Sequence, residues 1–170
     1  TSNTTTAPDG SMTADSLTEN TSDVRHLAGY NVRFDDLSLI GGVTTISTFL
    51  KANGRDYGVL KVNSSSGNYA SAIFELTGTG AVTETAEAGS CFLEDTGQIT
   101  SLGNDWYHCS LSVRTEITNT FFGIATSDGP TGIGSYGMPS HTGDVTKGIY
   151  IWGAHLYRSD LGGMVNNPAQ

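Results

Sequence analysis

The sequence predicts an all-β fold, a jelly-roll β-sandwich of two antiparallel sheets, and three observations support that prediction. Hydrophobic residues recur with a period of two in several short segments, which is typical of strands with one buried face. Turn residues separate these segments about every 8–12 positions, and 22 of the 170 residues are glycine. Only residues 13–20 could form helix, for a turn or two at most.

The first predicted strands lie at residues 24–34, 44–51 and 57–62. Residues 44–51 alternate, so that one face carries Ile46, Thr48 and Leu50, and the other carries Ser47, Phe49 and Lys51. Asn53-Gly54 is a strong turn signal. We therefore expect residues 57–62 to be the return strand, with Leu60 and Val62 on one face and Tyr57, Val59 and Lys61 on the other.

Further strands are expected at residues 69–76, 91–95, 106–115, 119–126 and 149–158. In residues 69–76, Phe74 and Leu76 lie opposite Ile73 and Glu75. The segment "WYHCSLSV" places an apolar set on the core face, namely Tyr107, Cys109, Leu111 and Val113. Its other face is mixed and partly exposed, and carries Trp106, His108, Ser110 and Ser112.

Length and charge limit the classes of protein that fit. The length suits one domain, assigned to residues 1–160, with 161–170 as a C-terminal tail or linker. The net charge is −9, which disfavours binding to nucleic acid or to an anionic membrane. No apolar run approaches the roughly 20 residues of a membrane helix, and the polar N-terminus does not resemble a signal peptide, although a trimmed signal would leave export open.

The two cysteines, Cys91 and Cys109, lie in neighbouring predicted strands. Antiparallel pairing of those strands could bring them within bridging distance, so the pair is a disulfide candidate. Two buried free thiols are the alternative, because free cysteine behaves as a small apolar residue.

The sequence offers few signs of catalysis or metal binding. The four histidines are scattered without the spacing of a zinc site, and the paired carboxylates Asp35-Asp36 and Glu94-Asp95 are more typical of solvated turns than of a glycosidase. Structural calcium is the one cofactor suggested, with Asp9 and Asp15 flanking an N-terminal turn. An Asx turn and a helix N-cap are the alternative roles of these two residues. No enzyme activity is expected.

Polar and aromatic residues recur on the outer faces of the predicted strands. If those faces belong to one sheet, they form a surface suited to sugars, whose C–H faces stack on rings and whose hydroxyls bond polar groups. The predicted glycan contacts are rings that stack and side chains that hydrogen-bond: Trp106, Phe49 and Tyr57, with His108, Lys61 and Glu75. For Trp106, a purely structural role at the open end of the sandwich is the alternative.

Five segments resemble a family of modules from tailed-phage virion proteins. They are "TTTAPDGSMTADSLTENT", "STFLKANGRDYGVLKV", "FELTGTGAV", "LEDTGQITSLGNDWYHCSLSV" and "GIYIWGAHLYRSDLG". The resemblance covers nearly the whole chain in the same order. It implies a non-catalytic jelly roll akin to carbohydrate-binding modules, found in head fibres, spikes and tail fibres.

The chain departs from this family at several positions. His108 stands where Arg is usual, Asp105 stands where Gly is usual, and Cys91 is unusual at its position. The insertion "TGQITSL" lengthens the loop before Trp106. An inherited ligand specificity is therefore not implied.

The predicted function is a non-catalytic, carbohydrate-binding-like adhesion module of a phage virion protein, at the virion surface or extracellular. Its partners would be a glycan or polysaccharide and neighbouring virion subunits. One alternative is a purely structural decoration or oligomerisation module, for instance a homotrimer that buries Ile149 and Ile151. Another is a carbohydrate-binding module of a secreted polysaccharide-degrading enzyme.

Overall fold

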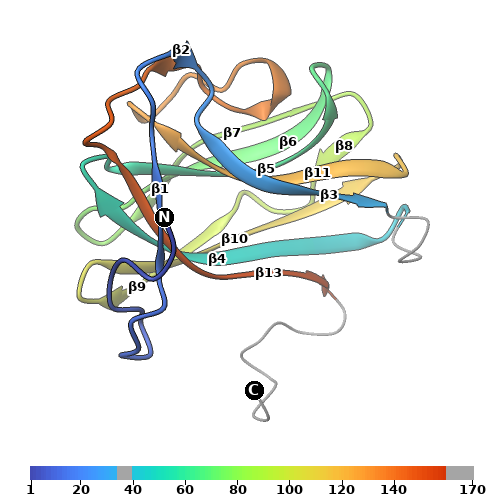
Figure 1. Cartoon of the computed structure of the whole chain (residues 1–170). Coiled ribbons are helices and arrows are strands. Elements are labelled where there is room, and N and C mark those ends of the chain that lie inside the picture. Colours follow the sequence, from blue (N-terminus) through green and yellow to red (C-terminus); the bar gives the residue numbers. More distant parts are fainter. Residues whose placement is uncertain (34–39, 160–170) are drawn as a thin grey trace.

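The computed structural model describes residues 1–33 and 40–159, and nearly all regular structure in them is β-strand (Figure 1). One 3₁₀ turn, η1 (Ser135–Gly137), interrupts the loop after β11. The strands are β1 (Asp15–Thr18), β2 (Asp23–Val24), β3 (Leu27–Arg33), β4 (Val43–Asn53), β5 (Tyr57–Ser65), β6 (Asn68–Glu75), β7 (Ala81–Ala88), β8 (Cys91–Leu93), β9 (Gln98–Gly103), β10 (Trp106–Thr115), β11 (Asn119–Ser127), β12 (His141–Thr142) and β13 (Gly148–Arg158).

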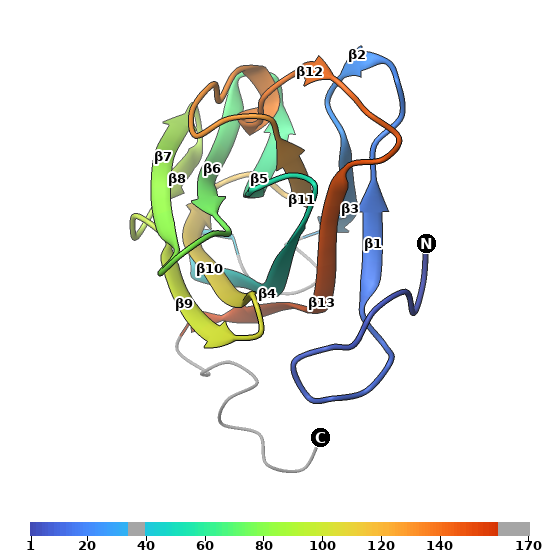
Figure 2. The same cartoon turned by 90° about the vertical axis from the view of Figure 1, so that its left-hand side faces the viewer.

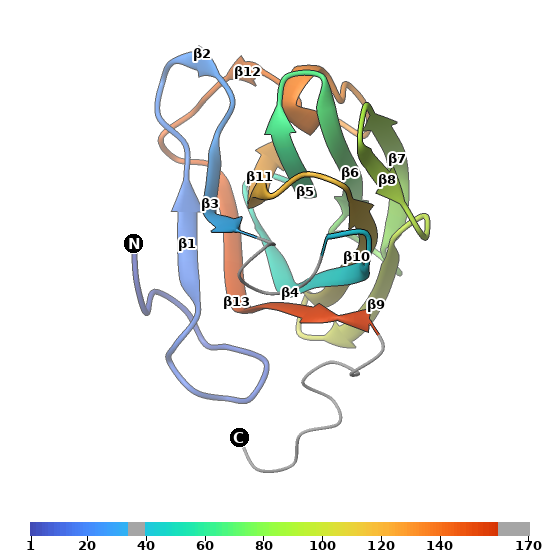
Figure 3. The same cartoon turned by 90° about the vertical axis from the view of Figure 1, so that its right-hand side faces the viewer.

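Eleven of these strands form one continuous antiparallel sheet that curls into a nearly closed barrel. Its strand order is β1-β13-β4-β10-β8-β7-β6-β5-β11-β3, with β9 paired to β10, and β2 and β12 form a separate two-stranded sheet. Figures 2 and 3 show the strands following one another around a ring. The all-β prediction is confirmed. The strands do not separate into two sheets, because β8 and β7 connect the β4/β10 side to the β5/β6 side.

The alternating pattern of the strands defines the barrel interior, as the sequence predicts. In β10, Tyr107, Cys109, Leu111 and Val113 are at most 3 % exposed and belong to the central core. The core also takes the inward residues of the facing strands, including Ile46, Leu50, Leu60, Val62, Phe74 and Leu76. Burial of this apolar set is the main stabilising contribution to the fold.

The expected hairpin at Asn53-Gly54 is wrong. Gly54 has the positive φ (80°) that the turn signal predicts, but β5 does not return alongside β4. Instead β4 pairs with β10 and β13, and β5 pairs with β6 and β11. The turn therefore leads the chain across the barrel, and the apolar faces of both strands meet in the same interior.

Two smaller expectations are also corrected, and one lies outside the described residues. Residues 13–20 contain the strand β1 rather than a helical turn, because β1 pairs with β13. Ile149 is fully buried in the core and Ile151 packs against it, so neither is an exposed residue available for trimerisation. The assigned tail, residues 161–170, lies outside the described residues.

Cys91 and Cys109 are not bridged, so the predicted disulfide is wrong. Both are buried free thiols. Cys91 lies opposite Thr115 of β10, six residues along that strand from Cys109, which is roughly 20 Å at the rise of a strand. The alternative role, two small residues of the apolar core, is the one observed.

In residues 1–33 and 40–159 no helix has the length and apolar character needed to cross a membrane.

Candidate functional site

The six residues predicted to bind glycan lie on the outer surface of the curled sheet, but in two separate groups. Trp106, His108 and Phe49 lie on β10 and β4, which pair directly, with His108 opposite Phe49. Tyr57, Lys61 and Glu75 lie on β5 and β6, on the other side of the barrel (Figure 2). The structure therefore does not bring the six into one site, because the sheet that joins them curves away between the two groups.

The outer face of β13, β4 and β10 carries a row of rings, which we call the aromatic stripe: Phe49, His108 and Trp152. The Phe49 ring centre lies 4.9 Å from that of His108 and 5.2 Å from that of Trp152. All three side chains are half-buried, so part of each ring faces solvent. Trp152 was not among the predicted contacts. Its signal was the alternation of the last strand, in which Tyr150 and Trp152 point to the same outer face.

Hydroxyl groups flank the aromatic stripe on the same outer face. They come from Ser110 of β10, which is half-buried, and from its partner Ser47 of β4, which is only 7 % exposed, so Ser110 is the more accessible hydroxyl. Burial lowers the pKa of His108, which favours a neutral imidazole with one donor and one acceptor nitrogen. Rings beside small hydroxyls and a neutral imidazole suit a sugar ring and its hydroxyl groups.

Trp106 lies at one end of the stripe but is 3 % exposed, because the N-terminal segment covers it. Its indole Nε1–H donates to the Thr6 carbonyl oxygen (3.1 Å), and the ring packs on Ala7 and Ala14. Trp152 also holds this segment, through its Nε1–H and Thr13 Oγ1 (3.0 Å). The structural role of Trp106 is therefore the observed one.

A cleft of about 600 Å³ lies between the N-terminal segment and the β9–β10 turn, with Trp106 on its wall. Lys51 also lines this cleft. Its ammonium donates to the Asn104 carbonyl oxygen (2.8 Å) and lies 3.7 Å from the Asp105 carboxylate. Lys51 follows Phe49 on the outer face of β4, so the cleft continues the aromatic stripe.

Tyr57 and Glu75 are half-buried neighbours on β5 and β6. Tyr57 packs against a small apolar cluster beneath the loop that follows β11. The Glu75 carboxylate accepts a hydrogen bond from Thr77 Oγ1 (3.0 Å) in the adjoining turn. These local contacts do not extend the aromatic stripe.

Lys61 is only 2 % exposed and lines a separate pocket with Arg25, on the outer face of β5. It was expected on a solvent-facing sugar surface, and the structure instead covers it with residues from η1 and the segment after it, including Met138.

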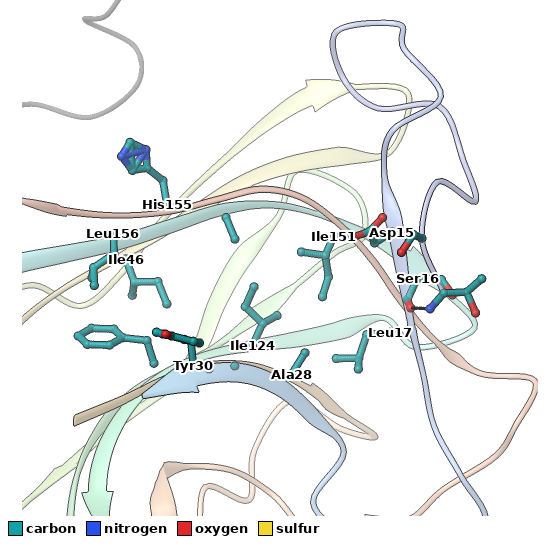
Figure 4. Close-up of a pocket in the computed structure, with 16 residues that line it drawn as sticks. Asp15, Ser16, Leu17, Ala28, Tyr30, Ile46, Ile124, Ile151, His155 and Leu156 are labelled. Atoms are coloured by element: carbon teal, nitrogen blue, oxygen red, sulfur yellow. Dashed lines mark hydrogen bonds between the residues drawn. The ribbon is translucent and has the colours of Figure 1, made fainter. Parts of the chain in front are cut away.

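An apolar cavity of about 580 Å³ lies at the seam of the barrel between its end strands β1 and β3 (Figure 4). Figure 4 shows Ile46, Leu156, Ile124 and Ile151 facing this space, while His155 points to the opposite side of β13. Tyr30 stands at the rim and is 77 % exposed. The lining offers apolar contact and few polar groups, which suits an apolar partner better than a sugar.

Glu19, His26 and His141 form the one three-residue cluster of metal-ligand type among the described residues. Sequence analysis missed it because the three residues are far apart in the chain. The Glu19 carboxylate is already saturated: it accepts hydrogen bonds from Arg55 Nε and Nη2 (both 2.8 Å), Thr126 Oγ1 (2.8 Å), His141 Nε2 (2.9 Å) and the Asp144 backbone N–H (3.0 Å).

Burial by itself would raise the pKa of Glu19, but the hydrogen bonds from Arg55 and His141, with those from Asp144 and Thr126, outweigh burial and hold the pKa well below its usual range. The cluster is therefore a buried ion-pair network that joins the segment after β1 to β11 and the loop beyond β12. Its full set of donors leaves no need for a metal ion.

The predicted calcium ligands are occupied by local contacts. Asp9 Oδ1 accepts hydrogen bonds from the Ser11 backbone N–H (2.9 Å) and Ser11 Oγ (2.6 Å), which is an Asx turn, and Asp15 Oδ1 accepts from the Asn3 N–H (2.9 Å). Within the described residues they do not share a cluster of three acidic, histidine or cysteine side chains. The turn role is the one the structure supports for Asp9.

The acidic pair Glu94-Asp95 also has structural contacts. Glu94 Oε1 accepts from Arg114 Nε (2.9 Å), and Asp95 Oδ1 accepts from the N–H groups of Gly97 (2.9 Å) and Ser112 (3.1 Å). These bonds fix the turn between β8 and β9. The other acidic pair, Asp35-Asp36, lies outside the described residues.

No protein-family model matches the chain, and no curated protein is significantly similar to it. The function of the chain therefore has to be inferred from its structure.

Proposed function

We propose that this chain is a non-catalytic glycan-binding module of the jelly-roll, carbohydrate-binding-module-like class. The observation that carries the proposal is the aromatic stripe of Phe49, His108 and Trp152, which leaves three adjacent ring faces half-exposed on the outer side of the barrel. Half-exposed rings with hydroxyl neighbours are the elements of sugar recognition. The cleft beside Trp106 and Lys51 gives the stripe a polar end.

The proposed setting is a phage virion protein such as a fibre, spike or decoration protein that acts in surface attachment. What supports it is the resemblance of five sequence segments to modules of that kind. A carbohydrate-binding module of a secreted polysaccharide-degrading enzyme would use the same surface.

A glycan array followed by calorimetric titration tests the proposal. Wild-type protein should bind at least one polysaccharide. The Phe49→Ala and Trp152→Ala variants should each lose about ten-fold or more in affinity, which is the usual effect of truncating an aromatic anchor. Phe92→Ala is the matched control, because Phe92 is a half-buried ring on another strand, covered by Arg114.

Unchanged affinity in both stripe variants would rule out this face. Incubation of the protein with acidic and neutral polysaccharides should give no shortened product, and any product would contradict the non-catalytic assignment.

The second candidate is a structural module that contacts neighbouring virion subunits without binding glycan. The seam cavity favours it, because that apolar surface lies between two end strands and beside the exposed Tyr30. Light scattering separates the two candidates: a stable oligomer without affinity for any arrayed glycan supports the structural role.

A further inference from the structure

The outer face of β3, β11 and β5 holds a second pocket, of about 340 Å³, on the other side of the barrel from the aromatic stripe. Its lining comes from four separate parts of the chain: Arg25, Leu27, Asn31, Lys61, Asn63, Ser64, Phe121, Tyr136 and Met138. The volume lies within the usual range of small-ligand sites, about 300–1,000 Å³.

Lys61 forms the floor of this pocket and has no anionic partner. The side chain is among the largest that are fully buried in the described residues, and those residues give its ammonium no hydrogen bond and no carboxylate within ion-pair distance. The Phe121 ring lies beside the ammonium, with its centre 5.0 Å from Nζ. A buried lysine is normally paired or neutralised, so this unpaired amine is available to an anion that enters the pocket.

The glycines at Gly29 and Gly123 explain how Phe121 reaches the ammonium. A Cβ atom on Gly29 would lie 2.4 Å from the Phe121 ring, and one on Gly123 would lie 2.7 Å from it. Because both side chains are absent, the ring lies flat across β3 and β11 beside Lys61. The floor of the pocket is therefore a ring face next to a cation.

A second cation stands at the mouth. The Arg25 guanidinium stacks over the Tyr136 ring at 4.5 Å, and the described residues place no carboxylate within ion-pair distance of it. Two unpaired cations lie together in a chain whose net charge is −9. Burial, and then repulsion from Arg25, lowers the pKa of Lys61 to about 7.

Polar groups without partners complete the lining. The side-chain oxygen of Asn63, which lines the pocket, is buried with no hydrogen-bond partner. The hydroxyl of Ser71, opposite Lys61 on β6 but outside the pocket lining, is also buried without a partner. Asn31 and Ser64 add an exposed amide and a half-buried hydroxyl. Buried polar atoms are normally satisfied, so these groups are suited to the hydroxyls of a bound molecule.

The loop after β11, which contains η1 and covers one side of the pocket, is held in place by hydrogen bonds. The Glu84 carboxylate accepts hydrogen bonds from the N–H groups of Gly132 (2.7 Å) and Ile133 (2.9 Å). Tyr136 has a φ of 65°, a left-handed conformation that a non-glycine residue adopts at a cost. That conformation holds its ring against Arg25, which indicates a preformed wall.

We propose that this pocket binds the carboxylate of an acidic sugar, with the ammonium of Lys61 and the guanidinium of Arg25 on the carboxylate, the Phe121 and Tyr136 rings against the sugar, and Asn31, Asn63 and Ser64 on its hydroxyls. The site is independent of the aromatic stripe and does not rest on the function proposed for it.

The test is calorimetric titration of the whole chain with glucuronate and galacturonate, with glucose as the neutral match and acetate and sulfate as simple anions. At least one uronate should bind, glucose should not, and the simple anions should bind more weakly. Lys61→Met and Arg25→Gln should each weaken uronate binding about ten- to hundred-fold, the effect of losing a hydrogen bond to a charged group. Lys147→Met, which removes an exposed charge elsewhere, is the control.

Two further readouts make the result specific. Lys61→Met should raise the melting temperature of the free protein while weakening uronate binding, because an unpaired buried charge is lost. Above pH 7, uronate binding to wild type should take up protons, seen as a dependence of the heat on buffer ionisation, and this uptake should vanish in Lys61→Met.

Failure of all uronates to bind, binding unaffected by both Lys61→Met and Arg25→Gln, or equal binding of glucose would overturn the proposal. Sulfate or acetate binding as tightly as the uronates would overturn the assignment to a sugar. The Phe49→Ala variant should bind uronate normally, so loss of the aromatic stripe and loss of this pocket give different results.

Discussion

The Glu19 carboxylate joins several segments that are far apart in the sequence. The side chain is fully buried. Its partners are Thr126 of β11, His141 of β12, Arg55 of the loop between β4 and β5, and Asp144 of the loop after β12. Removing one member of a buried ion pair leaves the other uncompensated. The stability of the region around β2 and β12 therefore depends on this one side chain.

We expect Glu19→Gln to lower the free energy of unfolding by about 3–5 kcal/mol, measured by urea denaturation at pH 7. Glu94→Gln, which breaks the exposed pair with Arg114, should cost less than about 1 kcal/mol. Similar losses in both variants would contradict the assignment of Glu19 as a buried anchor.

The Glu19 network should also give stability an acid dependence. The folded pKa of Glu19 lies below the ordinary value of 4.5, so the folded state binds the proton less readily than the unfolded chain. The stabilisation is complete above about pH 4.5 and is lost as pH falls below it. Wild type should lose stability more steeply than Glu19→Gln between pH 4.5 and pH 3 in urea titrations.

Lys61 should give a trend of the same sign, but at neutral to alkaline pH. Its folded pKa of about 7 lies below its ordinary value of 10.5, so burial of the charge is most costly below pH 7. Between these values the unfolded chain holds more protons, and stability rises with pH by at most about 1.4 kcal/mol per unit. The charged group that faces Lys61 is Arg25, which stays protonated throughout, while Phe121 and Ser71 are uncharged.

Urea denaturation from pH 7 to pH 9 measures this trend. Wild type should gain stability relative to Lys61→Met over that range. A constant difference between the two proteins would show that Lys61 keeps an ordinary pKa in the fold.

At the scale of elements, β8 and β10 place both cysteines in the core with no bridge. Burial raises the pKa of both thiols, by desolvation above all, so neither is reactive in the folded state. A thiol reagent should label no cysteine in the native protein and two per chain in guanidinium without reductant. Zero labelling in guanidinium would mean that the two are bridged after all.

The N-terminal segment depends on two tryptophans for its position over β10 and β13. Trp106→Phe removes the hydrogen bond to the Thr6 carbonyl but keeps the ring, so we expect a loss of about 1 kcal/mol and faster proteolysis before residue 15. Trp152→Phe, whose bond to Thr13 is exposed, should have the smaller effect. Equal proteolysis of wild type and Trp106→Phe would remove the anchoring role.

Strand alternation made the inner and outer faces predictable, because a period of two is a local property. The pairing of strands was not, since Asn53-Gly54 signals a turn without specifying which strand lies beside the next. Asp105 likewise has a left-handed φ of 62°, which marks the turn before β10 without specifying the strand that β10 pairs with. The sequence therefore predicts where the chain turns, but not which strand pairs with the strand that follows.

At the scale of the whole molecule, curling of the sheet decides which predicted site residues meet. Phe49 and His108 were predictable as neighbours because both lie on outward positions of adjacent strands. Lys61 shares that outward alternation, yet the curvature carries it to another face and the loop after β11 covers it. The Glu19 network was unpredictable for the same reason, since residues 19, 55, 126 and 141 meet only after the barrel closes.

The central claim is that the aromatic stripe of Phe49, His108 and Trp152 binds glycan, and one titration tests it most directly. The polysaccharide that binds wild type best on the array is titrated into wild type, the double variant Phe49→Ala/Trp152→Ala and the control Phe92→Ala, with folding checked by circular dichroism. The account predicts that the double variant loses measurable binding while the control binds as wild type does. A folded double variant with wild-type affinity, or a wild-type protein that binds no arrayed glycan, would contradict it.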